Sequence, residues 1–461
     1  MRAALAWALL ACSISSCSSD PAPPPPSDDP LALRPADDKN ADPNVVEVDL
    51  EAREGDKTYG TSPATRVWTY NGSIPGPLID AKVGDRVVIH FKNSLPEPTT
   101  IHWHGIRLPA SMDGTLAMQS PVAAGGTFEY AFTLKDAGLF WFHPHMRSDI
   151  QVQKGLYGVI RVRGTDEPAA DVERILVLDD IRLATDGTVS ESLDDTSKMM
   201  GREGKTLLVN GVANARLPLR PGSLARLRIV NVANGRFFNL RLAGHKLRVL
   251  GTDGGRFAKP YDVDTLLISP GERYDVMVTV DGPPGTEIAL VNEAYDRGHD
   301  SGGAAPMEVM RFALSTEAPP QAKTVPSAFP EPARLPDPQG GMGVELDEII
   351  RGENVVFTIN GKAFPDVPPF AVPRGEVRAI DITNKSEMDH PFHLHGFFFQ
   401  VVTRDGVAVP REELVDKDTV LVHAKSAMRI VARFDEPGKW MYHCHILEHG
   451  EAGMMGEIDV Q

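Results

Sequence analysis

Val87-Val88-Ile89-His90-Phe91 lies between Gly84 and Asn93, and its alternating apolar pattern is typical of a β-strand. The same arrangement occurs twice more, with nine residues from the glycine to the asparagine each time. The other two segments are Leu227-Arg228-Ile229-Val230, between Gly222 and Asn231, and Val377-Arg378-Ala379-Ile380, between Gly375 and Asn384. The asparagine of an Asn-Gly pair precedes each glycine by 12 to 15 residues, at Asn71-Gly72, Asn210-Gly211 and Asn360-Gly361. The sequence therefore predicts three copies of one unit.

Short strands bounded by Gly, Pro and Asn, with no sustained helical periodicity, predict an all-β protein made of sandwiches or barrels. We place unit one at residues 44–165 and unit two at residues 170–316. A stretch rich in Pro and Ala, residues 317–341, is typical of a long surface linker. Unit three then occupies residues 342–461.

Ten of the fourteen histidines fall into four clusters, each with a His-x-His pair in an apolar or aromatic run. On a strand, residues two apart lie on one side and roughly 6–7 Å from each other. Both imidazoles of a pair can therefore reach one metal ion or two neighbouring ions. The clusters are His102-Trp103-His104, His143-Pro144-His145, His390-Pro391-Phe392-His393-Leu394-His395 and His443-Cys444-His445-Ile446-Leu447-Glu448-His449.

The fourth cluster contains Cys444, the only cysteine after residue 17, and Met454 follows it by ten residues. Two histidines, a thiolate and a weak axial methionine form the blue-copper electron-transfer site. Cys444, His449 and Met454 supply three of these ligands, and His390 is the candidate for the fourth. Zinc also accepts His-x-His pairs, but it does not explain a lone cysteine with this methionine or the eight further histidines.

An extended His443-Cys444-His445 segment would direct the cysteine to one side and both histidines to the other. A copper on the sulfur and coppers on the imidazoles would then share one stretch of backbone, through which an electron can pass in a few bonds. The histidines left for such a cluster are enough for three coppers: His102, His104, His143, His145, His393, His395, His443 and His445.

A second internal match indicates where the metals lie. Asp136-Ala137-Gly138-Leu139-Phe140-Trp141-Phe142-His143 parallels Asp435-Glu436-Pro437-Gly438-Lys439-Trp440-Met441-Tyr442-His443, whereas the corresponding stretch of the middle unit, residues 284–291, has no histidine. A cluster that draws on units one and three must lie at their mutual interface. The middle unit is expected to be a spacer that helps to shape the substrate surface.

In type, order and internal spacing the four motifs resemble those of the multicopper oxidases, the family of laccases and copper-resistance oxidases, over essentially the whole mature chain. The resemblance implies three cupredoxin-like Greek-key domains and four copper ions per chain. It also implies one-electron oxidation of a reductant coupled to four-electron reduction of dioxygen to water. The implied ligands are His102 and His393 for the type 2 copper, His104, His143, His145, His395, His443 and His445 for the type 3 pair, and His390, Cys444, His449 and Met454 for the type 1 copper.

The resemblance also implies a proton donor. Asp113 lies eleven residues after His102, where similar enzymes carry an acid that contacts the water on the type 2 copper. The alternative for this residue is a turn aspartate before Gly114. Relatives often carry a second acid directly after the last type 1 histidine, but this chain has Gly450 there, and the adjacent Glu451 would point differently.

Two classes of reductant compete. A laccase-like enzyme would oxidise phenols or aromatic amines in a cleft beside His449, whereas a metal-ion oxidase would oxidise Cu(I) along a methionine-rich segment. The fifteen methionines are scattered, with only pairs at Met199-Met200 and at Met307 and Met310, which favours the laccase-like hypothesis. All expected ligands are present, which argues against a copper-free relative. A copper nitrite reductase is disfavoured as well, because such proteins resemble a two-unit arrangement with fewer copper ligands per chain than this sequence offers.

The charge balance and the N-terminus concern partners and location. The chain has 47 Lys and Arg against 63 Asp and Glu, a net charge of −16, so a nucleic-acid partner is not expected.

Residues 1–17 have the pattern of a signal peptide that ends in a lipoprotein-type box, Ile14-Ser15-Ser16-Cys17, and residues 18–43 are typical of a disordered tether rich in Pro and Asp. We therefore expect an exported bacterial protein, periplasmic or anchored to a membrane by lipid on Cys17. The alternatives are a box ending at Cys12 and ordinary secretion.

Overall fold

The computed structural model describes residue 29 and residues 31–461, apart from residues 61, 300, 302, 304, 352 and 353. The lipid-anchor prediction at Cys17 lies outside these residues. Within them the chain forms six β-sheets with only short helices, so the all-β prediction is confirmed. The helices are α1 (Ser148–Gln151), α2 (Asp195–Met200), α3 (Leu447–Glu451) and the 3-10 turns η1 (Ala110–Met112) and η2 (Arg411–Glu413).

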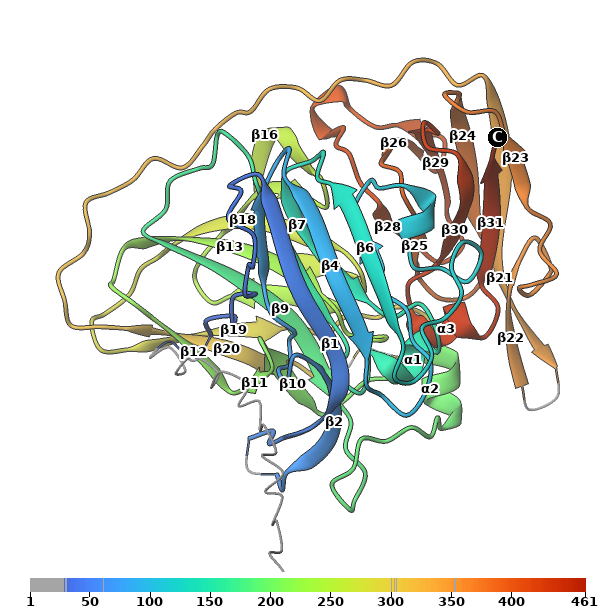
Figure 1. Cartoon of the computed structure of the whole chain (residues 1–461). Helices are drawn as coiled ribbons and strands as arrows, with labels where there is room; N and C mark the ends of the chain where they lie inside the picture. The colour runs from blue at the N-terminus through green and yellow to red at the C-terminus, as the bar shows by residue number, and fades with distance from the viewer. Residues whose placement is uncertain are drawn as a thin grey trace, which may run out of the picture.

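Unit one consists of two four-stranded sheets (Figure 1). The first has the order β2 (Thr65–Tyr70), β1 (Val45–Lys57), β4 (Arg86–Asn93) and β6 (Thr127–Thr133). The second has the order β3 (Ile79–Lys82), β8 (Gly158–Arg163), β7 (Gly138–His143) and β5 (His102–His104). The second sheet therefore presents its histidine-bearing strands together at one edge.

Unit two has a seven-stranded and a five-stranded sheet. The larger has the order β11 (Val212–Ala213), β10 (Thr206–Val209), β9 (Val172–Ile181), β13 (Ser223–Asn231), β18 (Arg273–Val280), β15 (Leu247–Thr252) and β16 (Gly255–Val263). The smaller has the order β12 (Ala215–Leu219), β20 (Met307–Leu314), β19 (Glu287–Asn292), β14 (Phe238–Leu242) and β17 (Leu266–Ile268). Between β20 and β21, which begins at Gly340, the chain runs along the outside of the molecule (Figure 1).

Unit three again pairs two sheets. One has the order β22 (Asn354–Ile359), β21 (Gly340–Arg351), β24 (Val377–Asn384), β29 (Ala427–Arg433), β26 (Phe399–Arg404) and β27 (Val407–Ala408). The other has the order β23 (Phe370–Val372), β31 (Met455–Val460), β30 (Gly438–Cys444), β25 (His390–Leu394) and β28 (Thr419–Val422). The strands that carry His393 and Cys444 are neighbours in this second sheet.

The repeated residues adopt the same turn and the same strand pairing in each unit. At each Asn-Gly pair both residues have positive φ, 52–54° for the asparagines and 72–77° for the glycines, which is the geometry of a tight hairpin turn. The strands β4, β13 and β24 each run parallel to the first long strand of their unit. The prediction of three copies of one unit is confirmed.

The asparagine at the end of each of these strands closes the loop that follows. Asn384 is buried, and its Nδ2 donates to the carbonyls of Met388 and Val422, at 2.8 and 3.1 Å, while Oδ1 accepts from the backbone of Ser386. Asn93 and Asn231 make the same three kinds of hydrogen bond. Because buried polar groups without partners are costly, these bonds fix the loops. In unit three the fixed loop leads directly to His390.

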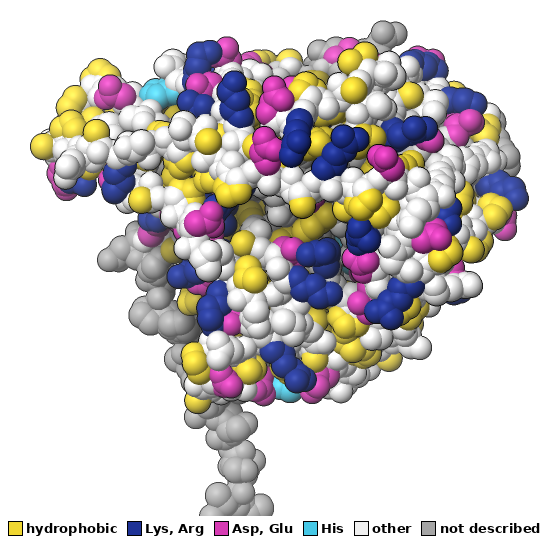
Figure 2. Space-filling model, turned by 90° about the horizontal axis from the view of Figure 1, so that it is seen from above, with side chains coloured by type: hydrophobic (Ala, Val, Ile, Leu, Met, Phe, Trp, Pro, Cys, Tyr) yellow, Lys and Arg dark blue, Asp and Glu magenta, His cyan; other side chains and the backbone are white. Residues whose placement is uncertain are grey.

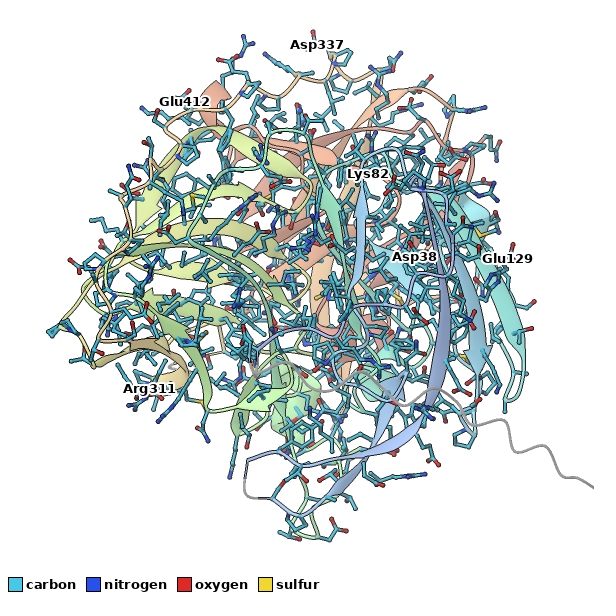
Figure 3. All side chains as sticks on the ribbon, turned by 60° about the vertical axis from the view of Figure 1, so that its left-hand side comes forward. Asp38, Lys82, Glu129, Arg311, Asp337 and Glu412 are labelled. Carbon is cyan, nitrogen blue, oxygen red and sulfur yellow. The ribbon has the colours of Figure 1, made fainter. Side chains whose placement is uncertain are left out.

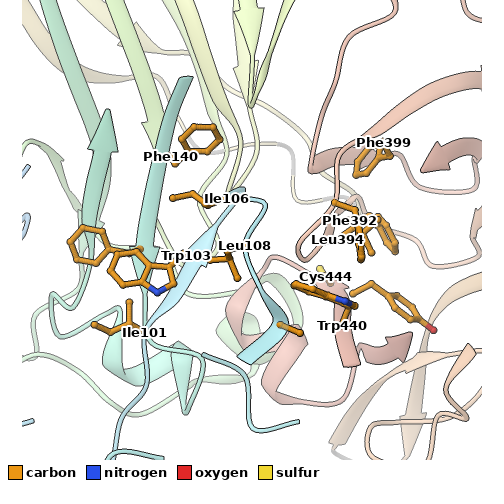
Figure 4. Packing of buried hydrophobic residues seen from close by; sticks show 14 of the residues in the cluster. Ile101, Trp103, Ile106, Leu108, Phe140, Phe392, Leu394, Phe399, Trp440 and Cys444 are labelled. Carbon is orange, nitrogen blue, oxygen red and sulfur yellow. The ribbon is translucent and has the colours of Figure 1, made fainter. Parts of the chain in front are cut away.

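Units one and three share a hydrophobic core. One cluster of buried side chains contains Trp103 and Leu108 of unit one together with Phe392 and Trp440 of unit three (Figure 4). Most of the apolar residues of unit two form a cluster of their own. The two units that carry the histidine motifs are therefore held to each other by tightly packed side chains, which limits their relative motion.

The outside of the molecule carries both signs of charge. Lys, Arg, Asp and Glu side chains are interspersed over the face seen in Figure 2. Among the described residues no helix has the length and the apolar content that crossing a membrane requires.

Candidate metal centre

The four His-x-His pairs lie where units one and three face each other. Strand β5 contains both His102 and His104, as expected for an extended pair. In the other three motifs the first histidine lies in a strand and the second lies beyond its end, at His145, His395 and His445. In these three motifs the strand ends within the motif, and both imidazoles of each pair still reach the cluster.

The eight histidines form three groups, in each of which the ligand nitrogens lie within 4.8 Å of one another. Every group combines residues of unit one with residues of unit three. The structure thus brings all eight together at the interface of the two units. The groups are His102, His104 and His393; His104, His143 and His445; and His145, His395 and His443.

The hydrogen bonds of the imidazoles indicate which nitrogens face a metal. In four of them Nδ1 lies 2.9–3.0 Å from a backbone carbonyl, and because a carbonyl only accepts, Nδ1 carries the proton and Nε2 a lone pair. These pairs are His102 with Asp113, His143 with Pro144, His393 with Asp418 and His443 with Cys444. His104 is reversed: its Nε2 is bonded, and its buried Nδ1 has no partner.

Lone pairs consequently point at one another. Nε2 of His395 lies 3.0 Å from Nε2 of His443, and Nε2 of His102 lies 3.5 Å from Nε2 of His393. Both members of each pair hold their proton on the other nitrogen, so neither can donate. Such contacts are repulsive unless a cation lies between the nitrogens. The donor set therefore fits bound metal ions.

Burial keeps these imidazoles neutral. It lowers the pKa of His443 to about 4, and burial together with the neighbouring histidines lowers the pKa of His104 and His393 well below the usual value. The neutral imidazole is the form that binds metals. The cluster is therefore ready to bind cations at neutral pH.

Asp113 lies between two of the histidines. Its Oδ2 accepts from Nδ1 of His395 at 2.9 Å, and Oδ1, which is buried without a hydrogen-bond partner, lies 3.3 Å from Nδ1 of His102. The turn that follows requires a glycine: Gly114 has φ +78°, and a Cβ there would clash with the carbonyl of Ile101. Asp113 is thus a turn residue as well as a partner of both imidazoles.

Sequence reasoning missed a second carboxylate, Asp418. It accepts from Nε2 of His104 at 3.1 Å and forms a two-pronged ion pair with Arg273 of unit two, with both N–O distances 2.6 Å. Unit two also supplies Gly271, where a Cβ would lie 2.9 Å from the ring of His445. Unit two is therefore more than a spacer. The only signal in the sequence is the charged pair Lys417-Asp418 directly before an apolar strand.

A fourth group brings together the residues predicted for a blue-copper site. Nδ1 of His390 and Nδ1 of His449 lie 3.5 and 3.7 Å from Sγ of Cys444 and 3.3 Å from each other. All three side chains are fully buried. Met454 is buried beside them, its backbone N–H donating to His449 and its carbonyl accepting from Cys444. Burial raises the pKa of the Cys444 thiol, so a thiolate here requires the positive charge of a bound metal.

Comparison with known proteins identifies the family. Residues 51–167, 174–302 and 336–461 each match a family model described as multicopper oxidase. The chain belongs to the multicopper oxidase family. This oxidase uses copper and couples the oxidation of a reductant to the reduction of dioxygen to water, as members of the family do.

Individual relatives cover nearly the whole chain. Multicopper oxidase MmcO of Mycobacterium tuberculosis is 35% identical, over 86% of this chain and 84% of the relative. A multicopper oxidase of Campylobacter jejuni, described as a metallo-oxidase, superimposes with a TM-score of 0.84 at 29% identity, covering 93% of this chain and 94% of the other. A laccase-like oxidase of Ochrobactrum sp., with activity towards lignin model compounds, gives 0.81 at 30% identity, covering 94% and 100%.

In this oxidase the edge of His449 is covered. Its Nε2 donates to the carbonyl of Met199, in α2, at 2.9 Å, and its ring is stacked on Phe357 with the centroids 3.8 Å apart. His390 is also closed off, because its Nε2 is hydrogen-bonded to Ser386 at 2.8 Å. A molecule in a cleft beside His449 would therefore meet the covering carbonyl of Met199 and not an exposed edge of the imidazole.

The acid that relatives often carry directly after the last type 1 histidine is absent from this oxidase, as the sequence indicates. A Cβ at Gly450 would lie 3.9 Å from Nδ1 of His443, so a side chain there would face the cluster. Glu451 does not take that place. Its Oε1 accepts from the backbone N–H of Ser148 at 2.7 Å and from the Ser148 hydroxyl at 2.9 Å, which ties α3 to α1.

Proposed function

We propose that this multicopper oxidase takes single electrons from a phenol or aromatic amine, with its type 1 copper held by His390, Cys444, His449 and Met454. The observation that carries the proposal is the position of Cys444. Its sulfur lies with His390 and His449, while its two neighbours in the chain, His443 and His445, belong to different groups of the histidine cluster. Copper supplies one-electron redox chemistry when it is bound, and this backbone joins the two sites covalently.

The histidine groups support the assignment of the other three coppers. His102 and His393, whose Nε2 atoms face each other, would hold the type 2 ion. The type 3 ions would take the six remaining histidines, in the two groups His104, His143 and His445, and His145, His395 and His443. The protein contributes fixed imidazoles, with Asp113 and Asp418 holding their orientation.

Met454→Leu is expected to keep the blue colour and to raise the type 1 potential, because loss of a weak axial donor destabilises Cu(II) relative to Cu(I). A redox titration followed at the visible band measures this shift. Met455, the next residue, supplies the matched control, and Met455→Leu should leave the potential unchanged. A lower potential in Met454→Leu would mean that another group is the axial ligand.

Cu(I) is the second candidate reductant, and α2 is the observation that favours it. This helix contains Met199 and Met200, and the carbonyl of Met199 is the group that covers His449. Thioethers suit Cu(I). The scattered methionines elsewhere support the organic reductant.

Dioxygen uptake with 2,6-dimethoxyphenol and with Cu(I) separates the two reductants. We expect faster uptake with the phenol, and little change when Met199 and Met200 are both replaced by leucine. Replacing Met307 and Met310 in β20 removes as many thioethers and is the control. Faster uptake with Cu(I) that falls only in the α2 variant would contradict the proposal and assign a metal-ion oxidase.

We infer that the protein is exported and anchored by lipid on Cys17, on the strength of the Ile14-Ser15-Ser16-Cys17 box and the tether that follows it. Cys17→Ser is expected to move the protein from the membrane fraction to the soluble fraction with the same specific activity, since the tether separates the anchor from the copper sites. Fractionation and mass spectrometry of the N-terminus test this. A wild-type protein that is soluble and unmodified at Cys17 would contradict the inference.

A further inference from the structure

Neither imidazole of the cysteine site reaches solvent, so an organic reductant cannot touch them directly and needs a binding site of its own nearby. A cavity of about 820 Å³ lies between units two and three, within the 300–1,000 Å³ typical of small-molecule sites. Its walls come from β16 and β18 of unit two and from β26, β28, β29 and η2 of unit three. The upper face of the molecule in Figure 1, which carries β16 and β26, is hollowed, and hydrophobic side chains line the hollow (Figure 2).

This cavity lies one strand away from the cysteine site. Val420 and Leu421 of β28 line it, and β28 pairs with β25, so that Leu421 is opposite Pro391 and Val422 is opposite His390. The cavity wall and a type 1 ligand therefore belong to adjacent hydrogen-bonded strands.

A second connection runs through side chains. His423 lines the cavity, and its Nδ1 lies 3.1 Å from a carboxylate oxygen of Asp389. Asp389 directly precedes His390 in the chain. Because the carboxylate accepts at Nδ1, Nε2 of His423 is left to bond a ligand. The His423 side chain is 59% exposed, so a molecule entering from solvent can reach it.

The interior of the cavity suits an uncharged aromatic ring. Phe257 and Tyr261 meet edge to face with their ring centroids 5.1 Å apart, and Tyr261 is 39% exposed, so its ring can be reached from solvent. Aliphatic side chains form much of the rest, among them Leu267, Val401 and Val415.

The buried charges of the cavity already have partners. Nζ of Lys417 is bonded to Thr252, Asp253 and Glu272, at 2.8, 2.9 and 3.3 Å. An ammonium group has three donors, so none is left for an anionic ligand.

The charges at the rim also disfavour an anion. Two cations, Lys259 and Arg404, stand against three carboxylates, Asp405, Glu412 and Glu413. Glu412 lies at the outer surface of the molecule (Figure 3). With a net charge of −16 on the whole chain, the field at this rim repels anions.

We propose that this cavity binds the neutral phenolic or aromatic-amine reductant, with its ring against Phe257 and Tyr261 and its hydroxyl or amino group at His423. The assignment rests on the proposed function and names where its substrate binds. A bound phenol loses one electron to the protein and one proton from its hydroxyl to water, and leaves as a phenoxyl radical. Four such phenols supply the four electrons that, with four protons, convert one dioxygen to two waters.

Binding can be measured without turnover. Calorimetric titration of the fully reduced, copper-loaded enzyme under argon with 2,6-dimethoxyphenol reports binding alone, because no electron can be transferred. Tyr261→Ala is expected to weaken binding about tenfold, as loss of an aromatic contact and its buried area predicts. Ala427→Trp, which narrows the cavity from β29, should weaken it as well. Val83→Ala, at an exposed apolar position in unit one, is the control and should bind normally.

Steady-state kinetics complete the test. In Tyr261→Ala the KM for the phenol should rise by the factor found for Kd, with kcat and Cu(I) oxidation unchanged, and 4-hydroxybenzenesulfonate should bind more weakly than the neutral phenol. Phenol oxidation with the same Kd and KM in all variants would overturn the cavity assignment and leave the proposed function intact. Phenol binding that Tyr261→Ala weakens, in an enzyme that oxidises only Cu(I), would support the site and overturn the proposed function.

Discussion

Cys444→Ser is expected to abolish both the intense visible band and oxidase turnover, while most of the copper in the histidine cluster stays bound. The colour of a blue-copper site comes with its thiolate, and a serine hydroxyl is a poor ligand for copper in this soft, buried group. The same residue joins the two copper sites through His443 and His445. The variant keeps all eight imidazoles of the histidine groups, so the copper bound by these groups should be retained.

Visible and electron paramagnetic resonance spectra, together with copper analysis, measure these effects. Cys17→Ser is the matched control, since it replaces the other cysteine expected in the exported protein and should remain blue and active. A Cys444→Ser protein that is still blue would refute the ligand assignment. Loss of all copper would show that the two sites do not load independently.

That the histidine motifs come together, and that Cys444 lies with His390 and His449, could be predicted from the sequence because each motif is local. The distance between the two imidazoles of a His-x-His pair at the end of a strand is set within three residues of sequence. The motifs also follow one another in a fixed order, on β5, β7, β25 and β30, which indicates the units that meet at the cluster. The repeated asparagines likewise indicate the three units, because each closes a loop of a few residues. Short-range chemistry of this kind leaves a pattern in the chain.

The surroundings of the ligands could not be predicted, because they depend on contacts between distant segments. Asp418 reaches His104 across 314 positions of sequence and Arg273 across 145, and the charged pair with Lys417 does not indicate either partner. The cover over His449 is the carbonyl of Met199, 250 positions away. Every residue type has a backbone carbonyl, so the sequence does not indicate which one covers His449, and this contact is known only from the fold.

Asp113→Asn is expected to slow the reoxidation of the reduced enzyme by dioxygen by about 10²–10⁴-fold, the range typical of a lost general acid. Reduction of the type 1 copper by the donor should stay nearly unchanged, because the Asp113 carboxylate lies at His102 and His395, in the histidine cluster. Asparagine can keep its Oδ1 as an acceptor for Nδ1 of His395, 2.9 Å away in the native protein, while it has no proton to release. The substitution thus separates proton delivery from the positioning of the imidazole.

Stopped-flow reoxidation of the fully reduced variant measures the effect, and Asp113→Ala completes the comparison. If Asp113 supplies protons, both variants are slow even where copper content is normal. If it only positions His102 and His395, the asparagine variant keeps the native rate and the alanine variant, which loses the acceptor, does not. Proton delivery is the expected outcome, because reduction of dioxygen to two waters consumes four protons. A side chain at position 450 would face His443, but Gly450 has none, and Glu451 is bound to Ser148, so neither residue after His449 shares the task.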